Sequence, residues 1–303
     1  MTEHVGPRAL IVEGGAMRGI FACGVLDHFL ETGFDPFDSF WAVSAGTTNL
    51  ASFLARMPGR NHKVYLDYSC RPPFVTPGRF ALGKHLIDLD WLWEISLREL
   101  PIDWDTLQAE QRPYFITLTN SASGEAEYHR PALPLLNETL KASSAMPLAY
   151  RGGVTLPSGN YVDGGVADAI PVAEAIRRGA KRILVLRSQS AHYRKTPPRI
   201  PALVKAMNRK TPALIPPLLA RAQRYNATLE LIRNPPEGVE IIELCPPDDF
   251  AIGRLTREPK ALQRAYEQGL AAGEEAVRAW EALNDAGRSP ATPCDQSHRE
   301  PAA

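Results

Sequence analysis

The sequence has few cysteines, and no two of them lie close together in the sequence. Its 303 residues include only Cys23, Cys70, Cys245 and Cys294, with no C-x-x-C spacing among them. This pattern excludes a zinc ribbon, a thioredoxin-type redox site and a disulfide scaffold. Because unpaired thiols suit a reducing compartment, we expect a cytoplasmic protein.

Long hydrophobic runs are missing as well. The opening MTEHVGPRALIVEGG lacks the basic stretch and long apolar run of a secretory signal. No uninterrupted apolar segment reaches the roughly 18 residues that a membrane-spanning helix needs. We therefore expect a soluble protein, which still leaves room for contact with a membrane surface.

The chain carries no net charge, since 34 basic residues balance 34 acidic ones. The charges are nevertheless uneven: residues 176–235 hold fourteen basic residues and one acidic residue. This segment either docks on an acidic face within the fold or faces anionic partners such as phospholipid headgroups. The rest of the chain is acidic and shows no nucleic-acid-binding motif, so we expect no nucleic-acid partner.

The pattern that is present is that of an α/β domain. Apolar strands are predicted at 9–12, 40–43, 114–118, 182–186 and 240–244, and helices at 20–30, 47–55, 134–141, 171–178 and 259–284. This alternation indicates a mostly parallel sheet that is covered on both faces. We expect a single domain over residues 1–284 and a disordered tail at 285–303.

Two segments interrupt the alternation. Residues 60–112 are rich in aromatics and proline, which predicts an insertion that either packs over the sheet or forms a substrate-facing cap. Residues 194–236 contain eight prolines, which predict short helices or loops.

A glycine-rich turn follows the first predicted strand. It consists of Gly14, Gly15, Ala16, Met17, Arg18 and Gly19. Glycines here let backbone N–H groups point into a cavity at a helix N-terminus, where the macrodipole favours negative charge. A dinucleotide site is the alternative, but Ala16 at the middle position departs from G-x-G-x-x-G.

Two further segments carry reactive side chains. Ser44 lies between a strand and a helix, as in a nucleophile elbow, and its neighbours are Ala42, Val43, Ala45 and Gly46. Asp163 follows Tyr161-Val162 at a predicted strand end and is followed by Gly164 and Gly165. We expect the glycine-rich turn and these two segments at the carboxyl ends of parallel strands, where together they form an acyl-transfer site.

A persuasive histidine is lacking. Only His192, at the edge of the proline-rich segment, and His298, in the predicted tail, follow Asp163. We interpret the earlier His28, His62, His85 and His129 as solvated or structural. A Ser-His-Asp triad is therefore not favoured, and no cluster of metal ligands is evident.

At this point the sequence resembles the patatin-like phospholipases, especially their bacterial branch. The resemblance lies in Leu10–Gly15 (LIVEGG) with Met17–Phe21 (MRGIF), in the serine and aspartate motifs, and in Ala142–Pro147 (ASSAMP); it is clear over residues 8–190. It implies a three-layer α/β/α fold and a Ser-Asp dyad in which the aspartate activates the serine without a histidine.

Carried over to this chain, the resemblance makes Ser44 the nucleophile and Asp163 its base, with the Gly14–Gly19 turn as oxyanion hole and no cofactor or metal. The family has a third glycine where this chain has Ala16, so a Cβ is expected to restrict φ there. Arg18 either orients the loop or meets a headgroup phosphate, or else it forms a salt bridge with Glu13.

The predicted function is that of a serine esterase or lipid acyl hydrolase, and the word lipid comes from the resemblance. The alternative is a non-catalytic lipid- or ligand-binding regulatory protein on the same fold. The basic segment also contains apolar residues, among them Leu203 and Leu218, that suit peripheral contact with an anionic membrane. We expect that neutralising its charges weakens binding to anionic vesicles; the residues concerned are Lys205, Arg209, Lys210, Arg221 and Arg224.

Overall fold

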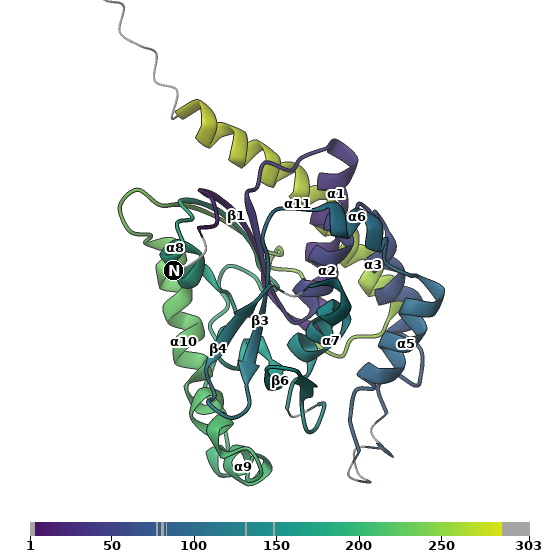
Figure 1. Cartoon of the computed structure of the whole chain (residues 1–303). Helices are drawn as coiled ribbons and strands as arrows, with labels where there is room; N and C mark the ends of the chain where they lie inside the picture. Colours follow the sequence, from purple (N-terminus) through teal and green to yellow (C-terminus); the bar gives the residue numbers. More distant parts are fainter. Residues whose placement is uncertain are drawn as a thin grey trace, which may run out of the picture.

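The computed structural model of the chain describes residues 4–76, 78–79, 82, 84–130, 132–147 and 149–286. A sheet of eight strands forms its middle layer (Figure 1). The strands follow the order β5-β6-β3-β2-β1-β7-β8, and β4 pairs with β3. The parallel strands are β1 (Arg8–Val12), β2 (Ser39–Val43), β3 (Tyr114–Asn120), β7 (Arg182–Leu186) and β8 (Glu240–Leu244). Antiparallel pairs add β4 (Ala126–His129), β5 (Val154–Leu156) and β6 (Gly159–Asp163).

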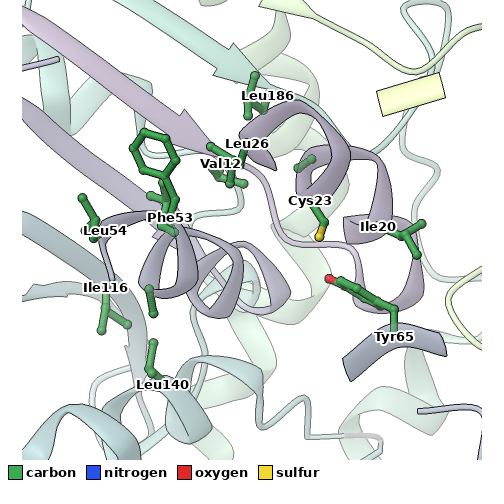
Figure 2. Packing of buried hydrophobic residues seen from close by; sticks show 14 of the residues in the cluster. Val12, Ile20, Cys23, Leu26, Phe53, Leu54, Tyr65, Ile116, Leu140 and Leu186 are labelled. Carbon is green, nitrogen blue, oxygen red and sulfur yellow. The ribbon is translucent and has the colours of Figure 1, made fainter. Parts of the chain in front are cut away.

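Helices cover both faces of the sheet. Side chains alternate along a strand, so Leu10 and Val12 of β1 enter one apolar cluster while Ala9 and Ile11 enter another. The first cluster includes residues of α1 (Ile20–Thr32), α2 (Ala45–Leu54), α7 (Leu133–Ser144) and α11 (Pro259–Ala286). The second includes residues of α8 (Val172–Arg177) and α10 (Ile215–Arg233). The predicted α/β/α sandwich is thus confirmed, and Figure 2 shows Val12 and Leu186 among the helical side chains of the first cluster.

Helices α1 and α11 approach each other closely because glycines face each other. A Cβ on Gly24 would lie 2.3 Å from the carbonyl oxygen of Tyr266, and one on Gly269 would lie 2.2 Å from that of Phe21. A larger side chain at either position would clash with backbone that cannot move alone. The contact therefore joins the last described helix to the first one.

The prediction for residues 194–236 was only partly right. Helix α9 (Pro201–Met207) and the 3-10 turn η4 (Pro212–Leu214) are short as expected, but α10 runs for 19 residues. Pro216 and Pro217 lie in the first turn of α10, where a backbone N–H has no acceptor within the helix. The prolines therefore begin this helix instead of interrupting it.

Residues 60–112 form a group of short helices beside the first cluster. They comprise α3 (Arg60–Lys63), the π-helical turn η2 (Val64–Tyr68), α5 (Leu89–Glu99) and α6 (Trp104–Ala109). Tyr65, Leu92 and Ile95 from this segment are buried in that cluster.

Two expectations of the sequence remain predictions. The single domain over 1–284 is one, and the tail at 285–303 is the other, because residues 287–303 lie outside the described residues. Within the described residues, no helix combines the length and apolar character that crossing a bilayer requires.

Candidate active site

Strands β2 and β6 end against adjacent residues of β3. Thr117 of β3 pairs with Val43 of β2, and Leu118 pairs with Asp163 of β6. Because β4 pairs with both of these β3 residues, it occupies one edge of β3, and β2 and β6 share the other edge. The expectation of a parallel strand before Asp163 was wrong: β6 is antiparallel and runs toward the end of β2. This opposed arrangement brings Asp163 level with Ser44.

The side chains of Ser44 and Asp163 meet at this point. The Ser44 hydroxyl donates a hydrogen bond to Oδ2 of Asp163 at 2.8 Å. The other carboxylate oxygen, Oδ1, accepts from the backbone N–H of Gly165 at 2.8 Å. Burial raises the pKa of the Asp163 carboxyl, although the nearby Arg221 charge and these hydrogen bonds act in the opposite direction. A carboxylate in this setting can take a proton from the hydroxyl.

Ser44 has the backbone geometry of a nucleophile elbow. Its φ of 54° and ψ of −130° place it between β2 and α2 in a conformation that non-glycine residues rarely adopt. A Cβ on Gly46 would lie 2.6 Å from the carbonyl oxygen of Val12, so this position requires glycine. Ala42, two residues before Ser44, is fully buried in β2.

The glycine-rich turn packs directly against Ser44. A Cβ on Gly14 would lie only 2.6 Å from the Cβ of Ser44. Gly15 and Ala16 follow, and within the described chain neither backbone N–H donates to another protein group. Ala16 has a φ of 51°. This is the left-handed region, in which a residue with a Cβ is strained and glycine is not. Two unpaired N–H groups beside the hydroxyl are what an oxyanion hole requires.

Ser44 lies where two cavities meet. Both cavities are lined by Ala16, Ser44, Ile87, Ser144 and Arg254. The first is otherwise mostly apolar, and residues 60–102 supply most of its wall, including Val64, Tyr65, Phe74, Leu89, Leu92 and Trp93. The second contains Asp163 and several basic side chains. No histidine of the described residues lines either cavity, and His192 is exposed beside Asp248.

Comparison with known proteins places this chain in a family. Residues 10–176, more than half of the chain, match the profile of the patatin-like phospholipases. The chain belongs to the patatin-like phospholipase family. Residues 211–284 of this patatin-like protein also match a domain of unknown function, DUF6363.

One relative and one solved structure complete the comparison. The uncharacterized protein YjjU of Escherichia coli (strain K12) is 36% identical over 276 residues, which cover 88% of this chain and 76% of that protein. The crystal structure of VipD from Legionella pneumophila aligns with a TM-score of 0.46 at 13% identity, covering 91% of this chain and 67% of that one.

Beneath the glycine-rich turn of this patatin-like chain lies a buried polar network. Glu13 accepts hydrogen bonds from the Nε of Arg187 at 3.1 Å, the N–H of Ser188 at 2.7 Å and the hydroxyl of Tyr225 at 2.7 Å. Arg187 also pairs with Glu243, and the Ser188 hydroxyl donates to the carbonyl of Gly14 at 3.0 Å. The network thereby fixes the base of the turn.

This network overturns one reading of Arg18. A salt bridge between Arg18 and Glu13 was one of the expectations, but Glu13 pairs with Arg187 instead. Arg18 is buried, and its Nε has no hydrogen-bond partner among the described residues.

Sequence reasoning gave no role to Ser143, which supports the elbow. Its hydroxyl accepts the backbone N–H of Ser44 at 2.8 Å and donates to the carbonyl of Thr117 at 2.8 Å. The resemblance had drawn attention to the ASSAMP segment, but only the fold shows that Ser143 bridges the elbow and β3.

We predict that Ser143→Ala lowers both stability and reactivity. The substitution leaves the buried N–H of Ser44 without its acceptor, which costs about 1–3 kcal/mol. Urea unfolding should show this loss, and Ser44 should react more slowly with a fluorophosphonate. The adjacent Ser144→Ala is the matched control, because the Ser144 hydroxyl donates only to the Leu140 carbonyl of its own helix. Equal behaviour of the two variants would contradict the assigned role.

Proposed function

We propose that the protein is a serine hydrolase that cleaves carboxylic ester bonds of phospholipids or other acyl lipids. The observation that carries this proposal is the 2.8 Å hydrogen bond from Ser44, which lines an apolar cavity, to Asp163. Membership of the patatin-like phospholipase family supports a lipid substrate.

The reaction follows from the positions of these groups. Asp163 takes the proton of Ser44 as its oxygen attacks the ester carbonyl, and the backbone N–H groups of Gly15 and Ala16 stabilise the negative oxygen. The alcohol leaves with a proton returned by Asp163. Water then attacks the acyl-enzyme with Asp163 again as base, which releases the fatty acid and the free serine.

The first test is labelling with a fluorophosphonate, which reports an activated serine without requiring the correct substrate. Intact mass should show one adduct on the wild type and none on Ser44→Ala. Ser144→Ala is the control, because Ser144 lines the same two cavities. No labelling of folded wild type would favour the alternative, a non-catalytic lipid- or ligand-binding protein. A panel of lipid esters would then identify the substrate of a labelled enzyme.

Helix α9 presents a surface that suits contact with a membrane. Helix α9 lies at the end of the molecule toward which β3 points (Figure 1). At this helix Ile200, Leu203 and Met207 are 61%, 52% and 44% exposed. Lys205, Arg209 and Lys210 are exposed beside them. An exposed apolar surface with basic neighbours suits an anionic bilayer.

Two of the basic residues expected at this surface point inward instead. Arg221 donates to the carbonyl of Gly165, and Arg224 donates to those of Val166 and Pro217. Leu218, which was also expected at this surface, is buried. The proposed membrane surface is therefore limited to α9 and its flanks. The expected cytoplasmic location remains a prediction.

We predict that the double variant Leu203→Glu, Met207→Glu binds anionic vesicles at least about tenfold more weakly. Burying one such side chain contributes about 1.5–3 kcal/mol, and 1.4 kcal/mol corresponds to tenfold in affinity. Co-flotation with vesicles containing phosphatidylglycerol measures this. Leu135→Glu is the control, since Leu135 is an exposed leucine on α7. Unchanged flotation of the double variant would exclude α9 as the contact.

A further inference from the structure

The second cavity beside Ser44 is lined by four basic side chains. They are Arg18, Lys195, Arg221 and Arg254. Each of the last three lies outside the part of the chain that matches the patatin-like family, which ends at residue 176. Arg221 and Arg254 fall within the segment that matches DUF6363. The carboxyl-terminal part of the chain therefore adds this basic wall to the family's site.

The acidic side chains of this cavity are already engaged. Its lining contains Glu13 and Asp163. Glu13 is bonded to Arg187, Ser188 and Tyr225, and Asp163 is bonded to Ser44 and Gly165. Among the described residues, none forms an ion pair with any of the four basic side chains. The cavity thus has an excess of positive charge that no described protein group neutralises by direct contact.

The four basic groups interact unfavourably with one another. Burial, together with the charges of Arg221, Arg254 and Arg18, lowers the pKa of Lys195 to about 7, although Glu13 acts in the opposite direction. Burial also lowers the pKa of Arg18, and the charge of Arg254 acts in the same direction. Buried charges without a partner are costly, and perturbed pKa values in a cleft cluster at functional sites. An anion bound between these side chains would offset both the burial and the repulsion.

Several donors are held ready for an anion. Arg18 is only 8% exposed, lines the cavity, and keeps a buried Nε without a partner in the described chain. The Nζ of Lys195 lies 4.4 Å from the ring centre of Tyr225, and its backbone is held by two hydrogen bonds to Asn226. Arg221 is anchored through Nε on the carbonyl of Gly165, which leaves its terminal nitrogens for other partners.

The position of these donors relative to Ser44 indicates which part of a substrate they contact. Ser44 separates the apolar cavity from the basic one, and Arg254 reaches both. When an acyl chain occupies the apolar cavity, its ester carbonyl lies at Ser44. The alcohol part of the ester is then directed into the basic cavity.

We propose that Arg18, Lys195, Arg221 and Arg254 bind an anionic group, a phosphate or a carboxylate, on the alcohol part of the substrate. The substrate is accordingly an acyl ester whose leaving alcohol carries a negative charge close to the ester bond. This inference rests on the proposed hydrolase function, because it places the scissile ester at Ser44. Arginine suits this task, since its planar group binds phosphate or carboxylate through two parallel hydrogen bonds.

A binding experiment tests the subsite without requiring hydrolysis. Calorimetry on Ser44→Ala would compare octyl phosphate, octanoate and the neutral octyl glucoside, each below its micelle-forming concentration, with inorganic phosphate as a fourth ligand. We expect at least one anionic amphiphile to bind more than about tenfold tighter than octyl glucoside. The phosphate and octanoate arms show which anion is preferred. Equal affinity for all three amphiphiles would overturn the proposal.

Substitutions then assign the preference to these residues. Lys195→Gln with Arg254→Gln should reduce it at least tenfold, while the paired control Lys181→Gln with Arg264→Gln, both exposed and outside the two cavities, should not. Circular dichroism establishes that both double variants are folded. A preference that survives in the Lys195, Arg254 variant would assign the anion to another place and overturn the proposal.

A kinetic experiment separates this inference from the hydrolase function. The ratio of kcat/KM for octanoyl glycerol phosphate to that for octanoyl glycerol should be high in the wild type and at least tenfold lower in the Lys195, Arg254 variant. A wild-type ratio near one would overturn the anion subsite but leave the hydrolase intact. No turnover of either ester, with the anion preference retained in calorimetry, would contradict the hydrolase and preserve the anion site.

Discussion

Asp163→Asn is expected to slow ester hydrolysis and fluorophosphonate labelling by about 10²–10⁴-fold, the usual contribution of a general base. The amide has nearly the shape of the carboxylate and can keep the hydrogen bond from the N–H of Gly165. It cannot accept the proton of Ser44. Labelling of this variant at the wild-type rate would show that another group activates the serine.

The same substitution is expected to raise the melting temperature at neutral pH. Burial raises the pKa of Asp163 in the folded protein above its ordinary value of 3.8, so the wild type loses stability as the pH rises through that folded pKa. Asparagine has no such loss, and the advantage of the variant should grow as the pH rises from 3.8 through the raised pKa of Asp163. Wild-type activity should rise over the same range, because the carboxylate is the active form.

Asp168→Asn is the matched control for these two effects. Asp168 is also an aspartate whose pKa is raised by burial, and it accepts hydrogen bonds from the hydroxyl of Tyr128 at 2.7 Å and the N–H of Ile170 at 3.2 Å. It does not touch Ser44. Hydrolysis should therefore persist in this variant, and a comparable loss of activity would mean that disturbance of the fold, and not loss of the base, explains Asp163→Asn.

Gly14→Ala is expected to reduce hydrolysis by about 10²-fold or more while the protein still folds. The added methyl group would lie 2.6 Å from the Cβ of Ser44 and 2.7 Å from the carbonyl oxygen of Val43. Both neighbours belong to the elbow, so the nucleophile must shift, and a displacement of about 1 Å costs this much in rate. The expected loss of stability is about 1–3 kcal/mol.

Esterase assays and urea unfolding of the same preparation separate these effects. Gly78→Ala is the control, because a Cβ on Gly78 has no heavy atom within 4 Å. It should change neither measurement appreciably. If Gly14→Ala retained wild-type kcat/KM, the contact between the glycine-rich turn and Ser44 would have no part in catalysis.

The layers of this fold could be predicted because they depend on local patterns. The apolar runs of β1 and β7 and the stop at Gly33 after α1 are visible in any short window of the sequence. The elbow could also be predicted, since Ser44 and its small neighbours are contiguous. Both follow from the spacing of side chains along one element.

The rest of the site depends on contacts between distant segments. The residues Tyr161-Val162-Asp163 read the same whether their strand is parallel or antiparallel, so the direction of β6 could not be inferred. Ser143 meets Ser44 across 99 positions of sequence. The basic wall draws on Lys195 and Arg221, whose segment was expected to dock on an acidic face within the fold or to face anionic partners, and on Arg254, for which no role was expected. Only the tertiary fold turns these charges toward Ser44.

The close contact between α1 and α11 has a consequence for synthesis on the ribosome. The glycines that allow it, Gly24 and Gly269, are separated by most of the chain. Until translation has passed Gly269, the face of α1 that α11 covers is open to solvent or to other chains. Contacts of such long sequence separation also form slowly. A nascent chain of this protein therefore exposes an unfinished apolar surface for most of its elongation, which is the condition under which incomplete chains aggregate.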